Sequence, residues 1–287
     1  MNDQANRLRA LARTQTPETN LFSSRVMAIA SGKGGVGKTN VVAGLAMSLA
    51  QLGQRVVVLD ADFGLANLDI LLGLSPEFTL EHVLRGEKLM EEILLEGPFG
   101  IRIIPASSGI QELTRLDSAA ELRLIQGLQR ISATNDWLLI DTAAGIHDSV
   151  IKLLMAAQEV LLVTTPEPTA LVDAYAMVKV VHLRDASKPI WLLVNNSQTQ
   201  TEAEETIEQL QAATQRFLGR ELQVLGMIPA DPHVLQAVRQ QRSVADLYPR
   251  SPAALAFQSI AGQVQKKVPL QKDGFASFWR QLSLEEP

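Results

Sequence analysis

The sequence of 287 residues contains no cysteine. This absence excludes a disulfide framework, a thiolate zinc site, an iron–sulfur cluster held by cysteine and a cysteine nucleophile. No apolar run reaches the ~18 residues that a membrane-spanning helix needs, and the first residues, MNDQANRLRA, lack the apolar stretch of a signal peptide. We therefore expect a cytoplasmic protein. The sequence has 26 Lys and Arg and 31 Asp and Glu, which gives a net charge of −5. We therefore do not expect nucleic acid to bind across the whole surface.

What the sequence does contain is a regular alternation of apolar segments, with 46% hydrophobic and 20% charged residues. Short β-branched runs predict buried strands, and apolar residues at helical spacing predict helices between them. We expect strands at Val26–Ala30, Arg55–Leu59, Ile101–Ile104, Trp137–Ile140, Val160–Thr165, Ile190–Val194 and Leu222–Ile228. We expect helices at Thr39–Leu52, Ser118–Ser132, Ser149–Ala156, Ala170–Arg184, Thr201–Phe217, Pro232–Arg239 and Ala253–Lys267. This order predicts an α/β fold with a mostly parallel twisted sheet, helices on both faces, and ligands at the carboxyl ends of the strands.

A glycine-rich loop follows the first strand candidate and opens the first helix candidate. Its sequence, GKGGVGKT over residues 32–39, satisfies the phosphate-binding pattern G-x-x-x-x-G-K-[ST]. Glycines let backbone N–H groups turn toward phosphate oxygens, and the helix N-terminus adds positive potential. We expect Lys38 to bridge the β- and γ-phosphates and the Thr39 hydroxyl to ligate Mg²⁺. The predicted nucleotide-binding residues here are Gly32, Lys33, Gly34, Gly35, Val36, Gly37, Lys38, Thr39 and Asn40.

Two further strand candidates end in acidic residues. Asp60 and Asp62 follow the second strand candidate, where two carboxylates are costly unless a cation or water lies near. Asp141 ends a later strand candidate in the Walker B arrangement, in which a carboxylate holds a water of the Mg²⁺ shell. Gly145 can bring its N–H close to the γ-phosphate without steric conflict. We predict that these residues form two switch segments beside the loop that carries Lys38.

The segment KGGVGKT, residues 33–39, resembles the deviant Walker A loop of the MinD/ParA ATPases, which are P-loop NTPases of the SIMIBI type. The resemblance covers nearly all of residues 25–267. It implies ATP and Mg²⁺ as cofactors, with ATP holding two copies together as a homodimer. It implies that Lys33 reaches the nucleotide of the second copy, as an arginine finger in trans does. It also implies that Asp60 supports the metal shell and that Asp62 positions the attacking water. The catalytic set is then Lys33, Lys38 and Asp62, and the metal set is Thr39, Asp60 and Asp141.

The resemblance also implies a base pocket. The guanine-reading motif N-K-x-D is absent, which favours ATP over GTP. The positions that contact adenine in the MinD/ParA ATPases match Asn195, Pro229 and Asp231, which follow the last two strand candidates. The alternative is that these three are ordinary turn residues.

The segment DADFGLANLDILLG, residues 60–73, resembles the MinD and flagellar branches of these ATPases more than the plasmid partition proteins. Residues 3–9, DQANRLR, match the D-Q-A-x-x-L-R motif of the flagellar-number regulators called FlhG, FleN or YlxH. This implies a regulator of flagellar number and placement that stimulates the flagellar GTPase FlhF through Asp3, Gln4, Leu8 and Arg9. A flagellar transcription activator and basal-body switch proteins are further implied partners. Two alternatives remain, a cell-division MinD and a ParA-like protein linked to DNA or transcription.

The C-terminal residues predict an amphipathic helix. Phe275, Phe278, Trp279 and Leu282 share one helical face, and cations lie nearby, which is typical of a helix at the surface of anionic lipid. The alternative is a terminal helix that docks on its own core. We therefore expect a peripheral position at the inner face of the cell membrane in the ATP-bound state. The predicted organisation is an activator helix and linker at 1–24, an ATPase domain at 25–268 and a membrane-targeting helix at 269–287.

Overall fold

The computed structural model describes residues 24–62, 67–105 and 118–267. These residues form one sheet of eight strands in the order β3-β4-β2-β5-β1-β6-β7-β8. The strands are β1 (Arg25–Ala30), β2 (Val56–Ala61), β3 (Leu95–Glu96), β4 (Arg102–Ile104), β5 (Trp137–Thr142), β6 (Glu159–Thr164), β7 (Ile190–Ser197) and β8 (Gln223–Pro229). Neighbouring strands pair in parallel, except that the two-residue edge strand β3 is antiparallel to β4.

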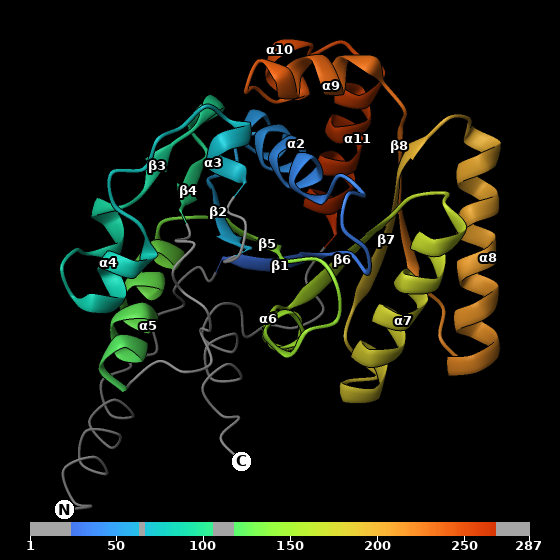
Figure 1. Ribbon diagram of the computed structural model, residues 1–287, viewed down its shortest axis with the longest axis horizontal. Coiled ribbons are helices and arrows are strands. Elements are labelled where there is room, and N and C mark those ends of the chain that lie inside the picture. Colours follow the sequence, from blue (N-terminus) through green and yellow to red (C-terminus); the bar gives the residue numbers. More distant parts are fainter. Residues whose placement is uncertain (1–23, 63–66, 106–117, 268–287) are drawn as a thin grey trace, which may run out of the picture.

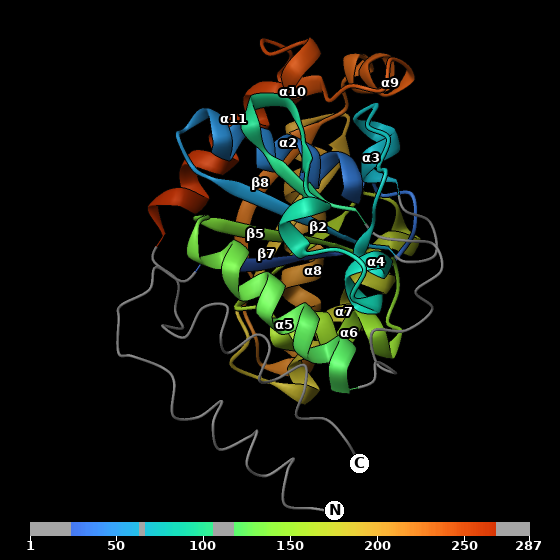
Figure 2. The ribbon, with the colours of Figure 1, turned by 90° about the vertical axis from the view of Figure 1, so that its left-hand side faces the viewer.

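Helices cover both faces of the sheet, as Figures 1 and 2 show. The helices are α2 (Lys38–Gln51), α3 (Leu68–Leu71), α4 (Leu80–Arg85), α5 (Ser118–Ala133), α6 (Asp148–Ala156), α7 (Pro168–Arg184), α8 (Gln200–Leu218), α9 (Pro232–Arg239), α10 (Val244–Leu247) and α11 (Pro252–Lys266). Two 3-10 turns lie at Met90–Glu92 and Pro98–Gly100. One apolar core joins the sheet to α4, α5, α6, α7 and α8, and a second core joins it to α2, α3, α9, α10 and α11.

The central strands β1, β2, β5 and β6 are buried at every position. Alternate residues of each strand feed the two cores, since Ala28 belongs to one core and its neighbours Met27 and Ile29 to the other. A strand of this kind has apolar neighbours on both sides and little freedom to move. The sheet is therefore a rigid support for the loops at its carboxyl edge.

The predicted α/β class and parallel sheet are confirmed, and the predicted strands and helices occur within about three residues of their expected bounds. The largest difference is in β7, which continues to Ser197 rather than ending at Val194. The sequence pattern missed β3, α3, α4 and α10, which are too short to show a periodicity. The N-terminal motif residues Asp3, Gln4, Leu8 and Arg9, and the C-terminal residues Phe275, Phe278, Trp279 and Leu282, lie outside the described residues. The domain boundaries at residues 24 and 268 thus stay predictions.

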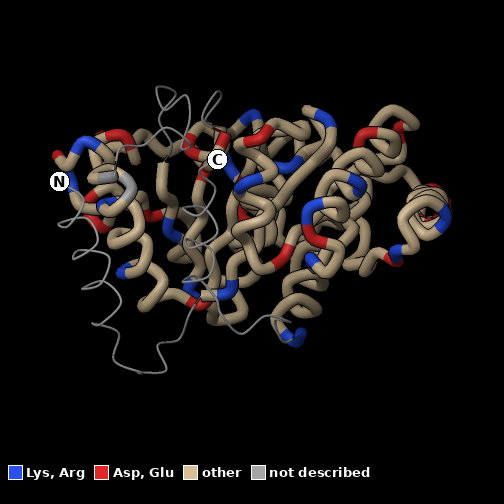
Figure 3. Tube along the Cα trace, turned by 90° about the horizontal axis from the view of Figure 1, so that it is seen from below, with Lys and Arg blue, Asp and Glu red and all other residues tan. Residues whose placement is uncertain are grey.

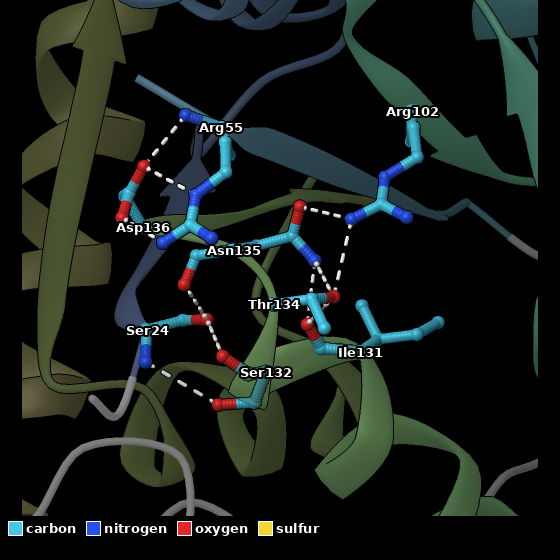
Figure 4. A network of polar contacts seen from close by, with 8 residues as sticks. All are labelled: Ser24, Arg55, Arg102, Ile131, Ser132, Thr134, Asn135 and Asp136. Atoms are coloured by element: carbon cyan, nitrogen blue, oxygen red, sulfur yellow. Dashed lines mark hydrogen bonds and ion pairs between the residues drawn. The ribbon is translucent and has the colours of Figure 1, made fainter. Parts of the chain in front are cut away.

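Polar contacts join the amino ends of the central strands (Figure 4). The Ser24 hydroxyl donates to the carbonyl oxygens of Ser132 and Asn135, at 3.1 and 2.9 Å. Arg55, just before β2, pairs with Asp136, just before β5, at 2.7 Å. These contacts fix the point at which the chain enters the sheet.

The surface carries both signs of charge. In the view of Figure 3, basic and acidic residues are interspersed along the described chain. Several are paired, including Arg130 with Glu91 and Arg184 with Asp148. Paired charges of this kind partly cancel, so they contribute little to the long-range field of the protein. Among the described helices, none combines the length and apolarity needed to cross a bilayer.

Candidate nucleotide-binding site

The glycine-rich loop lies between the carboxyl end of β1 and the N-terminus of α2, as the motif requires. Gly37 precedes the helix with φ of 84°, and a Cβ there would lie 2.4 Å from Nδ2 of Asn195. Gly32 is equally constrained, because a Cβ would lie 2.3 Å from the backbone of Asp173 in α7. The backbone of the loop thus packs closely against β7 and α7, and the first turn of α2 points its N–H groups at the loop.

Lys38 and Asp141 form a buried ion pair at the centre of the site. The Lys38 Nζ lies 2.5 Å from Asp141 Oδ1, and both side chains are less than a tenth exposed. Burial raises the pKa of Asp141, while the charge and hydrogen bond of Lys38 and a hydrogen bond from Thr39 oppose this rise. The structure therefore brings the predicted phosphate lysine, the predicted magnesium hydroxyl and the Walker B carboxylate together.

Asp60 and Asp62 lie beside this pair. Asp60 is opposite Asp141 in the register of β2 and β5. Its carboxylate accepts hydrogen bonds from the backbone N–H groups of Asp62, Asn67 and Leu68, at 3.1 to 3.2 Å. Burial, and then the nearby charge of Asp141, raise the pKa of Asp60 to about 7. The charge of Asp62 also raises the pKa of Asp141. Three carboxyl groups thus share one small region, where a cation would relieve their repulsion.

The donors at this place suit magnesium. Thr39, Asp60 and Asp141 offer hard oxygen atoms, which Mg²⁺ prefers, together with phosphate and water oxygens. Among the described residues, no group of three His, Asp or Glu side chains is arranged to hold a metal ion alone. This arrangement is consistent with a Mg²⁺ ion that takes most of its ligands from a nucleotide and from water, as is usual in sites of this kind.

Lys33 points along its own molecule toward α7. Its Nζ donates to Glu167 Oε2 at 2.7 Å and to Thr169 Oγ1 at 3.0 Å. The lysine and glutamate side chains are 39% and 64% exposed, so the contact lies at the surface. The sequence analysis missed Glu167 and Thr169. Two features could have indicated them. Both residues directly follow β6, the strand beside β1, and both lie at the start of a helix whose first residue is a proline.

The three predicted base-pocket residues have distinct surroundings. The Asn195 amide donates to the carbonyl oxygen of Val36 at 2.8 Å, so it braces the loop from β7. Pro229 ends β8 and is partly exposed. The Asp231 carboxylate accepts from the backbone N–H groups of His233 and Ala253, which links α9 to α11 and lowers its pKa against the effect of burial. These contacts give Asn195 and Asp231 structural roles, and their contact with a base stays a prediction.

The remaining residues predicted to bind the nucleotide lie in the glycine-rich loop or close to it. Gly145 has φ of 92° and donates its N–H to the carbonyl oxygen of Ser31 at 2.9 Å, so the segment after β5 touches the loop after β1. Gly34 and Gly35 are exposed at the tip of the loop, Val36 is buried beneath it, and Asn40 is partly buried in the first turn of α2. Residues 63–66, part of the first switch segment, lie outside the described residues.

The fold and site together define a nucleotide-binding protein of the P-loop class. Residues 27–244 match the family of CobQ/CobB/MinD/ParA nucleotide binding domains. The chain belongs to this family. It is 44% identical over 264 residues to the Antiactivator FleN of Pseudomonas aeruginosa, covering 92% of this chain and 94% of that protein. It is 33% identical over 291 residues to the Flagellum site-determining protein YlxH of Helicobacter pylori, covering 98% of each.

A solved structure extends the comparison to a bound nucleotide. The septum site-determining protein MinD of Pyrococcus horikoshii, complexed with Mg-ADP, has a TM-score of 0.69 and 28% identity, covering 85% of this chain and 96% of that chain. Together with the FleN and YlxH similarities, it confirms the resemblance to MinD/ParA-type ATPases and to their flagellar branch.

Proposed function

We propose that this protein is an ATP-dependent, dimerising ATPase that regulates the number and placement of flagella. The observation that carries the proposal is the 44% identity to the Antiactivator FleN along 92% of the chain. The similarity to YlxH, named as a flagellum site-determining protein, supports the same branch. The motif DQANRLR at residues 3–9 agrees with it.

The proposed ATP site uses the residues around the glycine-rich loop. Backbone N–H groups of residues 32–39 bind phosphate oxygens, and the Lys38 ammonium exchanges Asp141 for the β- and γ-phosphates. Thr39, Asp60 and Asp141 hold the magnesium ion directly or through water. When bound, the ion neutralises phosphate charge. The Gly145 N–H leaves the carbonyl oxygen of Ser31 and donates to the γ-phosphate, and Asn195, Pro229 and Asp231 border the adenine.

Hydrolysis in this proposal depends on the dimer. Asp62 holds the attacking water in line with the γ-phosphate. Lys33 leaves Glu167 and Thr169 and reaches the nucleotide of the second copy, where its charge stabilises the transition state. ATP thus joins two copies, and its hydrolysis separates them. The contact of Lys33 with Glu167 and Thr169 must therefore break during this cycle.

The terminal segments carry the proposed output. Residues 1–24 stimulate the flagellar GTPase FlhF through Asp3, Gln4, Leu8 and Arg9. Residues 269–287 place the protein at the inner face of the cell membrane, with Phe275, Phe278, Trp279 and Leu282 entering anionic lipid. A dimer presents two such segments, and two weak contacts raise the overall affinity by about 10²- to 10⁴-fold. A flagellar transcription activator and basal-body switch proteins complete the proposed partners.

The test of this function is a GTP hydrolysis assay with purified FlhF. Full-length protein should accelerate GTP hydrolysis, the variant without residues 1–20 should not, and Gln4→Ala should lose most of the effect. The matched control is Gln198→Ala, on the exposed carboxyl side of β7. Equal GTP hydrolysis with and without residues 1–20 would contradict the flagellar assignment. Activation of a division inhibitor in the same preparation would support the cell-division MinD alternative instead.

A further inference from the structure

The carboxylate of Asp231 is buried and fully occupied by hydrogen-bond donors. Its side chain is 1% exposed, although it lies just beyond β8, at the carboxyl edge of the sheet where ligands are expected. It accepts from the backbone N–H groups of His233 and Ala253, at 2.9 and 3.0 Å, and from the side chains of His233 and Ser251. Two carboxylate oxygens offer about four lone pairs, and these donors take them. Asp231 therefore has no acceptor left for a base.

His233 carries this cluster to the surface. Its side chain is 42% exposed, and its Nδ1 lies 2.8 Å from Oδ1 of Asp231. Its ring also packs against the ring of Tyr248, with 4.6 Å between the two ring centres. A ring held at one nitrogen and against a neighbouring ring is oriented before any ligand arrives, which lowers the entropy cost of a later contact. His233 is therefore an oriented polar group above a buried anchor.

The contact with Asp231 decides which nitrogen of His233 carries the proton. Burial tends to raise the pKa of this carboxyl, but its hydrogen bonds outweigh burial and hold that pKa below its ordinary value. An ionised carboxylate has no hydrogen to donate, so Nδ1 of His233 is the donor in this contact. The hydrogen bond at one ring nitrogen sets the tautomer, and in the neutral ring Nε2 is then an acceptor. His233 thus presents a single acceptor at the surface.

His233 lies on the side of the nucleotide-binding site that Asn195 borders. The Asn195 amide contacts the carbonyl oxygen of Val36 in the glycine-rich loop, and Asn195 pairs with Ile228 in the register of β7 and β8. Shortly after this pair the chain reaches Asp231, which caps α9. The helices α2 and α9 pack on the same face of the sheet, as Figure 1 shows. A nucleotide with its phosphates at the start of α2 and its base beyond Asn195 extends toward the first turn of α9.

We propose that Nε2 of His233 accepts a hydrogen bond from the 6-amino group of adenine, and that this contact selects ATP over nucleotides with a carbonyl group at that position. The inference rests on the ATP binding proposed above and names the residue that reads the base. Adenine carries a donor at position 6, whereas guanine carries an acceptor there. A carbonyl group facing Nε2 leaves both acceptors without a hydrogen, and such a mismatch weakens binding. Asp231 acts as a positioning residue, because its carboxylate keeps the proton on Nδ1.

Binding of three diphosphates to the full-length protein tests this role, because diphosphates are not hydrolysed at the site. The three are ADP, purine riboside diphosphate, which has a hydrogen in place of the amino group, and inosine diphosphate, which has a carbonyl group there. Affinities are measured by competition with a fluorescent nucleotide at about pH 8, where imidazole is ordinarily neutral. The unmodified protein should bind ADP about 2- to 10-fold more tightly than purine riboside diphosphate, and inosine diphosphate most weakly.

Three variants separate base reading from folding. His233→Ala should lose the preference for ADP while its affinity for purine riboside diphosphate stays nearly unchanged. Asp231→Ser keeps a residue that caps helices well but removes the carboxylate that holds Nδ1, so it should lose the same preference. Gln236→Ala is the matched control, since Gln236 is exposed one turn later on α9, and it should keep the preference. Thermal melting of each variant confirms that it is folded.

The possible results distinguish this inference from the function on which it rests. If the unmodified protein binds the three diphosphates equally, or if His233→Ala keeps the preference or weakens all three alike, the inference is overturned while the proposed ATP binding stands. If Asp231→Ser is folded and keeps the preference, the positioning role of Asp231 is overturned. If the unmodified protein binds none of the three, the proposed function fails together with this inference.

Discussion

Removing the charge of Glu167 should make the protein dimerise more readily with ATP. In the structure, Glu167 holds Lys33 against its own molecule at 2.7 Å. The proposed dimer needs Lys33 at the nucleotide of the second copy, so each copy must break this contact before the dimer is complete. Glu167→Gln keeps the size and shape of the side chain but removes its charge. Relative to the dimer, the variant therefore weakens the form in which Lys33 contacts Glu167 of its own molecule.

The expected change in dimerisation follows from the solvent exposure of the Lys33 and Glu167 side chains. The two side chains are 39% and 64% exposed, and pairs of this kind contribute about 0.2–1 kcal/mol. A dimer breaks two such contacts, which gives about 0.4–2 kcal/mol and a change of roughly 2- to 30-fold in the association constant. Glu167 also precedes the N-terminus of α7, where a negative charge stabilises the helix by about 0.3–1 kcal/mol, so a small decrease in melting temperature should accompany the substitution.

The assay is sedimentation velocity over a range of protein concentrations, with Mg²⁺ and a slowly hydrolysed ATP analogue. Glu204→Gln is the matched control, because Glu204 is an exposed acid on α8 that accepts from Gln200 rather than from Lys33. Lys33→Ala should abolish ATP hydrolysis by the dimer. In the Lys33→Ala background, Glu167→Gln should no longer change the association constant. Weaker dimerisation of Glu167→Gln than of the unmodified protein, or the same gain in the Lys33→Ala background, would refute the reasoning.

Three further outcomes are expected at the nucleotide site. Lys38→Ala should lower ATP affinity at least about tenfold, measured with a fluorescent nucleotide, since a charge-assisted contact to phosphate is lost; unchanged affinity would remove Lys38 from the site. Asp62→Ala should stop hydrolysis and leave an ATP-bound dimer by size-exclusion chromatography with light scattering, and a monomer at saturating ATP would contradict its role. The raised pKa of Asp60, about 7 against an ordinary 3.8, means that its contribution to folding stability is full below pH 3.8 and is lost as the pH rises through about 7. The nucleotide-free protein should therefore melt at a lower temperature at pH 7.5 than at pH 5.5, and Asp60→Asn should reduce that difference; an unchanged difference would contradict the assignment.

The sequence predicted the parts of the site whose chemistry is local. The loop of residues 32–39 has the spacing of glycines and lysine that is typical of phosphate-binding loops, and Asp141 directly follows a run of apolar residues that predicts a buried strand. Both positions could therefore be predicted from the sequence alone. Contacts between distant segments could not be read in this way. Nothing in the sequence near Lys33 indicates Glu167, because 134 residues separate them and only the pairing of β1 with β6 brings them together. The same holds for Asp231, whose carboxylate links α9 to α11 through contacts that no local pattern reveals.

The two ends of β1 bear on how a nucleotide acts on the terminal segments in the proposed function. Ala30 leads into the glycine-rich loop at one end, and at the other end Arg25 donates to the carbonyl oxygens of Val264 and Lys267, the last residues that the structure describes. Every residue of β1 is buried, and close-packed strands of this kind resist compression and sliding. A signal passed along β1 as strain would therefore have to displace both cores. The proposed dimerisation needs no such displacement, because it changes only the number of copies in one particle, and two weak contacts bind more tightly than one.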